Sequence, residues 1–501
     1  MSVSVSERPA PTTFRFPGPD HRGLLLGLRA PQVAILGATV VAAVATLMAI
    51  PSGLGLGLTM ALFGIGLPSA LVRVRRRNLD EWAPVVLRWW VRRARGQLRW
   101  VSPVPLLGDR TGQGERAAPP PPLAGVSLLK VSRVGSRDVA VAKDARAGTY
   151  TGVVACRGRA FDLLDAAEQD RLCALWGQAL AAFAQEGSPV TRVAWVERTV
   201  PEDGDALHAH LADNAVLDPD HPLRSSYADL IARAGPVSQQ HDAYVVVSIG
   251  ATKARRAIRQ AGGGDEGACE VLVRELTTLT DRLHQAEVDV VGVLGPRQLA
   301  GCLRAAFDPA SARPHARRAR QDASRAGTSG RNAWPLATEV AWGHYRTDSG
   351  VHATYWVAEL PRRDVHAAFL QPLLVRPSGM HAVSVVMEPV APSKAARAVE
   401  SAHASHVADE ELRAKAGYLP SARRRREHEA ILAREAELAN GHAECRFSAY
   451  VSVTAPDVEA LEYLGGEIEQ LGFDAQVELR RLYGEQDQAF TYTLPLGRGL
   501  R

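Results

Sequence analysis

The sequence has no phosphate-binding loop and very little cysteine. No Gly-Lys-Ser or Gly-Lys-Thr follows a glycine-rich turn, and the glycine run from Gly262 to Gly264 leads directly into Asp265 and Glu266. Acidic side chains at that place repel phosphate, so we do not expect a nucleotide site there. The five cysteines include no Cys-x-x-Cys pair, which argues against a zinc site or a disulfide framework and favours reduced, buried thiols.

Catalytic and metal-ligating patterns are also missing. His208 and His210 lie two residues apart, and His403 and His406 fall on a stretch with the composition of an exposed helix. Neither pair has the further ligands that a metal site needs. Serine, cysteine and histidine form no recognisable nucleophile arrangement. We therefore expect a protein that is not an enzyme and that binds no cofactor and no metal.

Charge is absent from two neighbouring stretches, residues 31–50 and residues 54–72. A bilayer core of about 30 Å needs roughly 20 apolar residues at helical rise, so each stretch is long enough to cross it. The connection contains Pro51 and Gly53, which end helices. The pattern predicts a transmembrane helical hairpin over residues 31–72, preceded by a loose cytoplasmic leader over residues 1–30.

The charges that flank the hairpin predict its orientation. Arginines precede it, and Arg73, Arg75, Arg76 and Arg77 follow it, whereas the turn carries no charge. Cytoplasmic segments of membrane proteins are enriched in Arg and Lys. We therefore expect a two-pass protein of the inner (cytoplasmic) membrane, with both termini and the large remaining region in the cytoplasm.

Residues 73–122 are expected to hold a juxtamembrane amphipathic helix and a proline-rich linker. Trp82, Trp89 and Trp90 lie in an arginine-rich stretch at helical spacing. Tryptophan at headgroup depth with arginine beside it is typical of a helix that lies on membrane lipid. These three tryptophans and the four arginines after the hairpin are the predicted membrane anchor. The alternative is an ordinary amphipathic helix packed on the soluble region.

The remaining sequence alternates between strand and helix patterns in two similar halves. We expect a first α/β subdomain over residues 123–308, a basic linker loop over 309–331, and a second subdomain over 332–501 that carries a charged helical arm over 392–440. The runs at 243–248 and 449–454 occupy matching places, and each is followed by a helix and a strand. The predicted fold class is α+β, with two related antiparallel-sheet subdomains of split-βαβ type. The last strand is expected at residues 489–494.

The basic loop offers an alternative function. Arg317, Arg318 and Arg320 belong to a run that is poor in apolar residues, as in segments that neutralise phosphate. No aromatic side chain is interleaved for base stacking. A membrane-tethered protein that binds nucleic acid is thus a rival interpretation, but it is not favoured.

A resemblance narrows the function. The hairpin with its cationic exits resembles the PrgI-type small membrane subunit of type IV secretion (conjugation) systems. The charged arm ending at Gly441-His442, the strand at 447–453, and the terminal segments at 482–490 and 494–499 resemble the N-terminal domain that precedes the motor of the large type IV secretion ATPases. No motor domain follows in this chain. The resemblance implies a scaffold that docks a separate P-loop ATPase and joins other channel subunits as an oligomer.

The contacts expected for that ATPase lie at the arm and near the C-terminus: Arg423, Arg424, Arg425, Arg426, Tyr483 and Phe490. A membrane component of a type VII secretion system, which can also have two spans and a cytoplasmic domain, is the other alternative.

Overall fold

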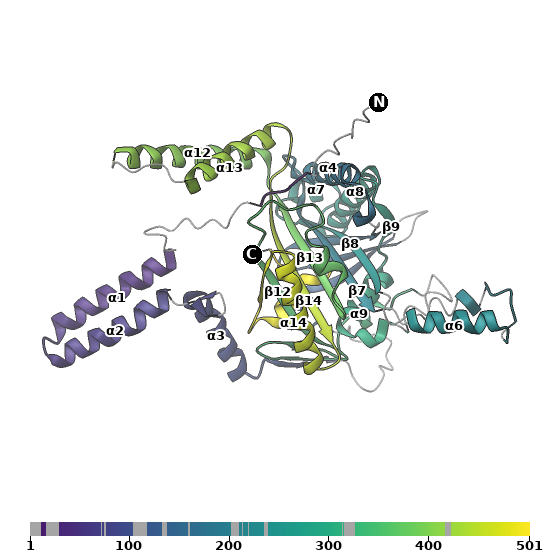
Figure 1. Ribbon diagram of the computed structural model, residues 1–501, viewed down its shortest axis with the longest axis horizontal. Helices are drawn as coiled ribbons and strands as arrows, with labels where there is room; N and C mark the ends of the chain where they lie inside the picture. The colour runs from purple at the N-terminus through teal and green to yellow at the C-terminus, as the bar shows by residue number, and fades with distance from the viewer. Residues whose placement is uncertain are drawn as a thin grey trace, which may run out of the picture.

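The computed structural model describes most of the chain. The described residues are 12–16, 30–71, 73–74, 77–103, 118–132, 138–158, 161–201, 210–212, 214–218, 220–234, 239–312, 314, 326–415 and 422–500. Within them an antiparallel sheet with helices on both faces forms the body of an α+β domain, and a pair of apolar helices projects from it (Figure 1).

The projecting pair consists of α1 (Ala30–Ala49) and α2 (Gly53–Leu71), both long and apolar enough to cross a membrane. Small and polar side chains hold the two helices together. The Gln32 side chain donates a hydrogen bond of 2.7 Å from Nε2 to the buried carbonyl oxygen of Ala70. A Cβ at Gly66 would overlap the side chain of Thr39, so this glycine allows the close approach that packing between membrane helices requires.

Thirteen strands form one continuous antiparallel sheet in the described residues. Along the main path the strands are β3 (Arg99–Val101), β10 (Ala337–Val340), β11 (Tyr345–Arg346), β12 (Val351–Glu359), β14 (Cys445–Ala455), β13 (Met380–Pro389), β7 (Val190–Pro201), β8 (Gln239–Gly250), β6 (Thr149–Arg157), β5 (Val139–Asp144) and β4 (Val126–Val131). Strand β15 (Glu478–Arg481) also pairs with β12, and β9 (Asp289–Val293) also pairs with β6. Two short strands, β1 (Arg73–Val74) and β2 (Arg77–Asn78), pair separately.

The two halves of the sequence build the two halves of this sheet in the same order. Strands β9, β6, β8 and β7 are neighbours in one half, and β15, β12, β14 and β13 are neighbours in the other. The halves meet where β7 pairs with β13, with Val196 opposite Ser384. If Tyr244 and Tyr450 are taken as equivalent, Val196 and Ser384 are equivalent too, since Tyr244 pairs with Val196 and Tyr450 with Ser384.

The sheet is therefore shared, whereas we expected each subdomain to have its own. The physical reason is the edge problem: an unpaired strand edge leaves backbone donors and acceptors without partners. By pairing with each other, β7 and β13 remove one free edge from each half. Strand β3 is also unexpected. Residues 99–101 belong to the stretch predicted to hold the juxtamembrane helix and the linker, but they pair with β10 and form an edge of the sheet.

Helices cover both faces of the sheet. One face packs against α4 (Ala166–Ala181), α7 (Arg255–Gln260), α8 (Gly264–Gln285), α11 (Gln371–Val375) and α14 (Val458–Asp474). The other face packs against α9 (Pro296–Phe307), α3 (Leu79–Ala94) and the C-terminal segment with α15 (Gln486–Phe490). Successive side chains in β8 alternate between the two faces. Val245 and Val247 pack in the core under α4, α7 and α8, and Val246 packs in the core under α9 and α3.

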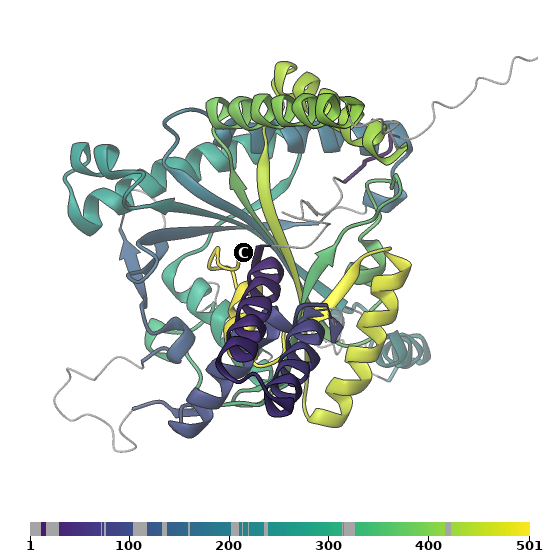
Figure 2. The ribbon, with the colours of Figure 1, turned by 90° about the vertical axis from the view of Figure 1, so that its left-hand side faces the viewer.

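Each half carries a helical insertion between its two central strands. Helix α6 (Pro222–Ala234) lies between β7 and β8, and the arm of α12 (Pro392–Lys415) and α13 (Ala422–Ala439) lies between β13 and β14. The insertions project from opposite ends of the sheet, the arm on the same side as the apolar hairpin (Figures 1 and 2). This placement follows from the antiparallel pairing of β7 with β13, which turns the two strand hairpins in opposite directions.

The C-terminal segment forms helix instead of the strand expected at residues 489–494. After α15 the chain continues in a 3₁₀ turn at Thr491–Thr493. Local hydrogen bonds favour this conformation: Thr491 Oγ1 donates to Gln488 O at 2.7 Å, and Thr493 Oγ1 donates to Phe490 O at 3.0 Å. The segment covers a sheet face, where Leu494 and Leu496 are buried.

A buried histidine predicts how stability depends on pH. His352 contacts Thr347 Oγ1 at 2.8 Å and Thr454 Oγ1 at 2.9 Å, and its ring lies 4.2 Å from that of Phe490. Burial lowers its pKa to about 3. The unfolded chain binds a proton near pH 6.5 and the folded protein does not, so stability is full above pH 6.5 and falls as the pH drops toward 3.

We expect this one residue to remove about 2 kcal/mol of unfolding free energy between pH 7 and pH 5. Urea unfolding of the detergent-solubilised protein at the two pH values measures this loss. In His352→Phe the difference in unfolding free energy between pH 7 and pH 5 should be smaller by about 2 kcal/mol, even if the variant is less stable at pH 7. An equal loss in the variant would contradict the assignment.

Candidate membrane-coupling site

Helix α3 connects the apolar hairpin to the sheet. It begins directly after β2, and its first turn carries Asp80 and Glu81, which suit the positive end of a helix dipole. It ends before Gly96, whose φ of +65° closes the helix in the left-handed conformation that glycine adopts easily. The inner face is apolar, and Trp82, Val85 and Trp89 are buried there.

The inner face of α3 packs into an aromatic cluster on the domain. The ring of Trp82 stacks on Trp342 at 5.8 Å and lies 6.3 Å from Tyr483, and Trp89 meets Trp342 edge-on at 5.4 Å. Gly484 has a φ of +75°, and a Cβ there would lie only 2.8 Å from the Trp342 ring and 2.9 Å from Val85. A larger residue at this position would therefore push α3 away from the domain.

Two ion pairs fix α3 to the C-terminal segment. Arg92 donates to both carboxylate oxygens of Asp487, at 3.2 and 2.7 Å. The Asp487 side chain is only 4% exposed, so little water competes for it. Arg88 lies 3.3 Å from Glu485, whose side chain is largely buried. The acidic pair thus sets the rotation of α3 about its axis.

The outer face of α3 has a different composition. Leu87, Trp90 and Val91 are exposed, and Trp90 is 63% exposed. Their spacing of three and four residues places them on one stripe of the helix. Arg93 and Arg95 lie in the exposed part of the same segment. Helix α3 therefore has two apolar faces, one against the protein and one outward.

The predicted membrane anchor divides between these faces. Trp82 and Trp89 face the domain, which corresponds to the alternative of an amphipathic helix packed on the soluble region, and Trp90 faces outward. Arg73 lies in β1 and Arg77 in β2, next to the end of α2. Arg75 and Arg76 lie outside the described residues.

The predicted partner-contact residues are not brought together. Tyr483 belongs to the aromatic cluster under α3. Phe490 is 3% exposed and packs on Phe307 and Tyr345, so it is a core residue with no surface for a partner. The arginines from Arg423 to Arg426 lie in the first turns of α13, far along the arm, and their side chains lie outside the described part.

The leader is attached to the domain over residues 12–16. Phe14 and Val365 exchange backbone hydrogen bonds of 2.8 and 3.0 Å, and the Arg15 guanidinium pairs with Asp364 at 2.7 Å. The rings of Phe16 and Phe369 lie 5.3 Å apart. We expected a loose leader, and for this stretch that is wrong, because a short exchange of hydrogen bonds with the domain is sufficient to hold it.

Reactive and ligating groups are few in the described residues. No group of three His, Cys, Asp or Glu side chains is placed to hold a metal ion there. The five cysteines are free thiols, and burial raises the pKa of Cys156 to about 12 and that of Cys445 to about 11. Such thiols stay protonated and inert at neutral pH. Of the basic loop, residue 313 and residues 315–325 lie outside the described part, and these include Arg317, Arg318 and Arg320.

Sequence reasoning missed the receiving half of the site: Trp342, Glu485 and Asp487. Each lies far along the chain from α3, and nothing in the local pattern marks it as a partner of that helix. One signal was present: two acidic side chains stand in a terminal segment that is otherwise largely apolar, and buried carboxylates require cations.

Part of the chain matches a known protein family. Residues 237–357 match the model of a protein family described as "Putative type VII ESX secretion system translocon, EccE". The matched stretch runs from β8 through α8 and α9 to β12, so it includes central strands from both halves of the sheet. No curated protein matches the chain. A central part of this domain is therefore similar to a component of a secretion translocon of type VII.

Proposed function

We propose that the protein is a membrane-anchored subunit of a type VII secretion translocon. The observation that carries the proposal is the family match across the centre of the sheet. The two apolar helices supply the membrane association that such a subunit needs. The resemblance to type IV systems also led to a secretion apparatus, but the family match favours the type VII alternative over it.

The domain works at the membrane surface in this proposal. The hairpin crosses the bilayer, and α3 holds the sheet close to it through Trp82, Trp89 and the pair of Arg92 with Asp487. The outer stripe of Leu87, Trp90 and Val91 rests on lipid. The arginine-rich sequence after the hairpin favours anionic headgroups, because each cation near them contributes about 1 kcal/mol. The translocon's other membrane subunits are its partners.

We also propose a fold type for each half of the sheet, a non-enzymatic role for the chain and a partner for its arm. Each half of the sheet is of split-βαβ type, which the order β9, β6, β8, β7 and its counterpart support. The protein itself has no enzymatic activity. Its arm, through the cluster from Arg423 to Arg426, contacts a separate P-loop ATPase of the same apparatus.

Purification of the assembly tests the function. The full chain carries an affinity tag in a cell that has a type VII system, and membranes are solubilised in a mild detergent. We expect the tagged chain to migrate on a native gel with the other membrane subunits of that system, and a variant lacking residues 30–71 to lose them. Recovery of type IV subunits, or of the tagged chain alone, would contradict the proposal.

A further inference from the structure

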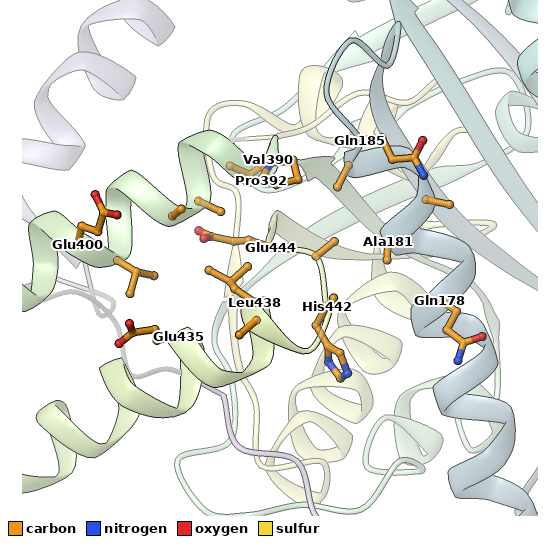
Figure 3. A pocket seen from close by; sticks show the side chains of 18 of the residues that line it. Gln178, Ala181, Gln185, Val390, Pro392, Glu400, Glu435, Leu438, His442 and Glu444 are labelled. Carbon is orange, nitrogen blue, oxygen red and sulfur yellow. The ribbon is translucent and has the colours of Figure 1, made fainter.

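A trough lies at the root of the arm. Helix α12 leaves the sheet after β13, α13 returns to β14, and the C-terminal end of α4 forms the third wall (Figure 3). The trough has a volume of about 710 Å³. Small apolar side chains make up most of its lining: Ala181, Ala182, Ala184, Val390, Ala395, Ala396, Val399, Leu438, Ala439 and Ala443.

The charged side chains of the trough are all acidic. Glu400 and Glu435 stand on facing helices, and Glu444 lies between α13 and the sheet (Figure 3). No Lys or Arg is among the lining residues. One oxygen of Glu444 accepts a hydrogen bond from Arg434, while the other, Oε2, is buried with no hydrogen-bond partner among the described residues. A buried carboxylate oxygen without a donor is costly, so a ligand that brings a donor would be stabilised there.

The apolar surface continues beyond the trough toward the tip of the arm. Val407 is 40% exposed and lies two helical turns beyond Val399 on α12, and Leu432 is 43% exposed on the part of α13 opposite. Residues four apart share one side of a helix, so Val399, His403 and Val407 form a stripe. From Pro392 to Val407 this seam is about 24 Å long at helical rise.

The length of the seam, its alanine-rich lining and its acidic side chains together indicate which kind of ligand fits it. Walls of alanine let a helix backbone approach to the 8–10 Å between axes that packed helices adopt. Two antiparallel helices with little apolar surface between them are marginal by themselves, and a third would complete a bundle. We propose that the seam between α12 and α13 binds one amphipathic helix of a partner protein, with small apolar residues on one side and Lys or Arg beside them.

Binding of a helix in the seam does not depend on the proposed role in a translocon, because it is inferred from the residues that line the trough. It also differs from the contact assigned to the arginines of α13, because the seam lies at the root of the arm and prefers a cationic partner.

Binding of model peptides to the full-length protein in detergent tests the inference. The first peptide is a helix of about 16 residues, the length of the seam, with an alanine and leucine face and lysine on both borders; in the second, glutamate replaces each lysine. By fluorescence anisotropy we expect the lysine peptide to bind at least about tenfold more tightly, because like charges facing each other across an interface oppose binding.

Matched variants locate the site. Ala396→Trp fills the trough from an exposed position and should weaken the lysine peptide about tenfold or more, whereas Ala398→Trp, exposed on another side of α12, should not. Glu435→Lys should weaken it and Glu437→Lys should not, since residue 437 lies outside the trough.

Several results would overturn the inference. Equal affinity for both peptides would indicate a purely apolar ligand such as an acyl chain. No binding of the lysine peptide, or equal effects of Ala396→Trp and Ala398→Trp, would remove the seam as its site. A concentration-dependent doubling of mass that Ala396→Trp abolishes would assign the seam to a second copy of this chain instead.

Discussion

Replacing Arg92 with alanine should loosen the attachment of α3 to the domain. The change leaves the carboxylate of Asp487, 4% exposed, without its bidentate partner. Breaking a buried ion pair from one side costs about 3 kcal/mol or more, because the remaining charge stays out of water. The free energy for opening α3 should fall by that amount, and the amide hydrogens of α3 should exchange about a hundredfold faster.

The opposite deletion should be milder. Asp487→Ala leaves Arg92, whose side chain is already 20% exposed and can turn toward water. Hydrogen exchange followed by mass spectrometry of the solubilised full chain compares the two. Arg93→Ala serves as the control, because Arg93 is exposed on the same helix. If Arg92→Ala and Arg93→Ala gave the same exchange rates in α3, the ion pair would have no part in coupling the hairpin to the domain.

The sequence allowed the hairpin and most of the strands to be predicted because their signals are local. An uncharged run of membrane length identifies α1 and α2, and the matching runs around Tyr244 and Tyr450 identify β8 and β14 as equivalent strands. Both kinds of pattern depend only on neighbouring residues. The α+β class follows from them directly.

The joining of the halves and the site under α3 depend on residues far apart in the chain. Nothing near Val196 shows that its strand pairs with the strand of Ser384. Likewise, the spacing of Trp82, Val85 and Trp89 shows an apolar stripe, but it does not show whether lipid or Trp342 covers it. The sequence therefore predicted an amphipathic α3 correctly, while the inner face could be assigned only once the aromatic cluster and Asp487 were placed.

The sidedness of the hairpin is the prediction with the clearest outcome. Arginines flank both ends of the hairpin, which favours cytoplasmic ends. The structure adds an independent argument. Phe14, before α1, exchanges backbone hydrogen bonds with Val365 of the domain, and α3, after α2, packs on the same domain. A domain that contacts the chain on both sides of the hairpin requires both ends on one side of the membrane.

We therefore expect reporters fused at Asp20 and at Arg110 to show the cytoplasm, and a reporter at Ser52, in the turn between the helices, to show the outside. The measurement uses two reporter enzymes, one active only in the cytoplasm and the other active only outside it, and each is fused in turn at the three positions.

Reversing Arg15 to Glu breaks its pair with Asp364 and tests the leader contact separately. The change should make the amide hydrogens of residues 12–16 exchange faster without changing the reporter pattern, because the other arginines around the hairpin remain. An outside signal from Arg110 would place the sheet on the far side of the membrane, and a cytoplasmic partner of the arm would then be untenable.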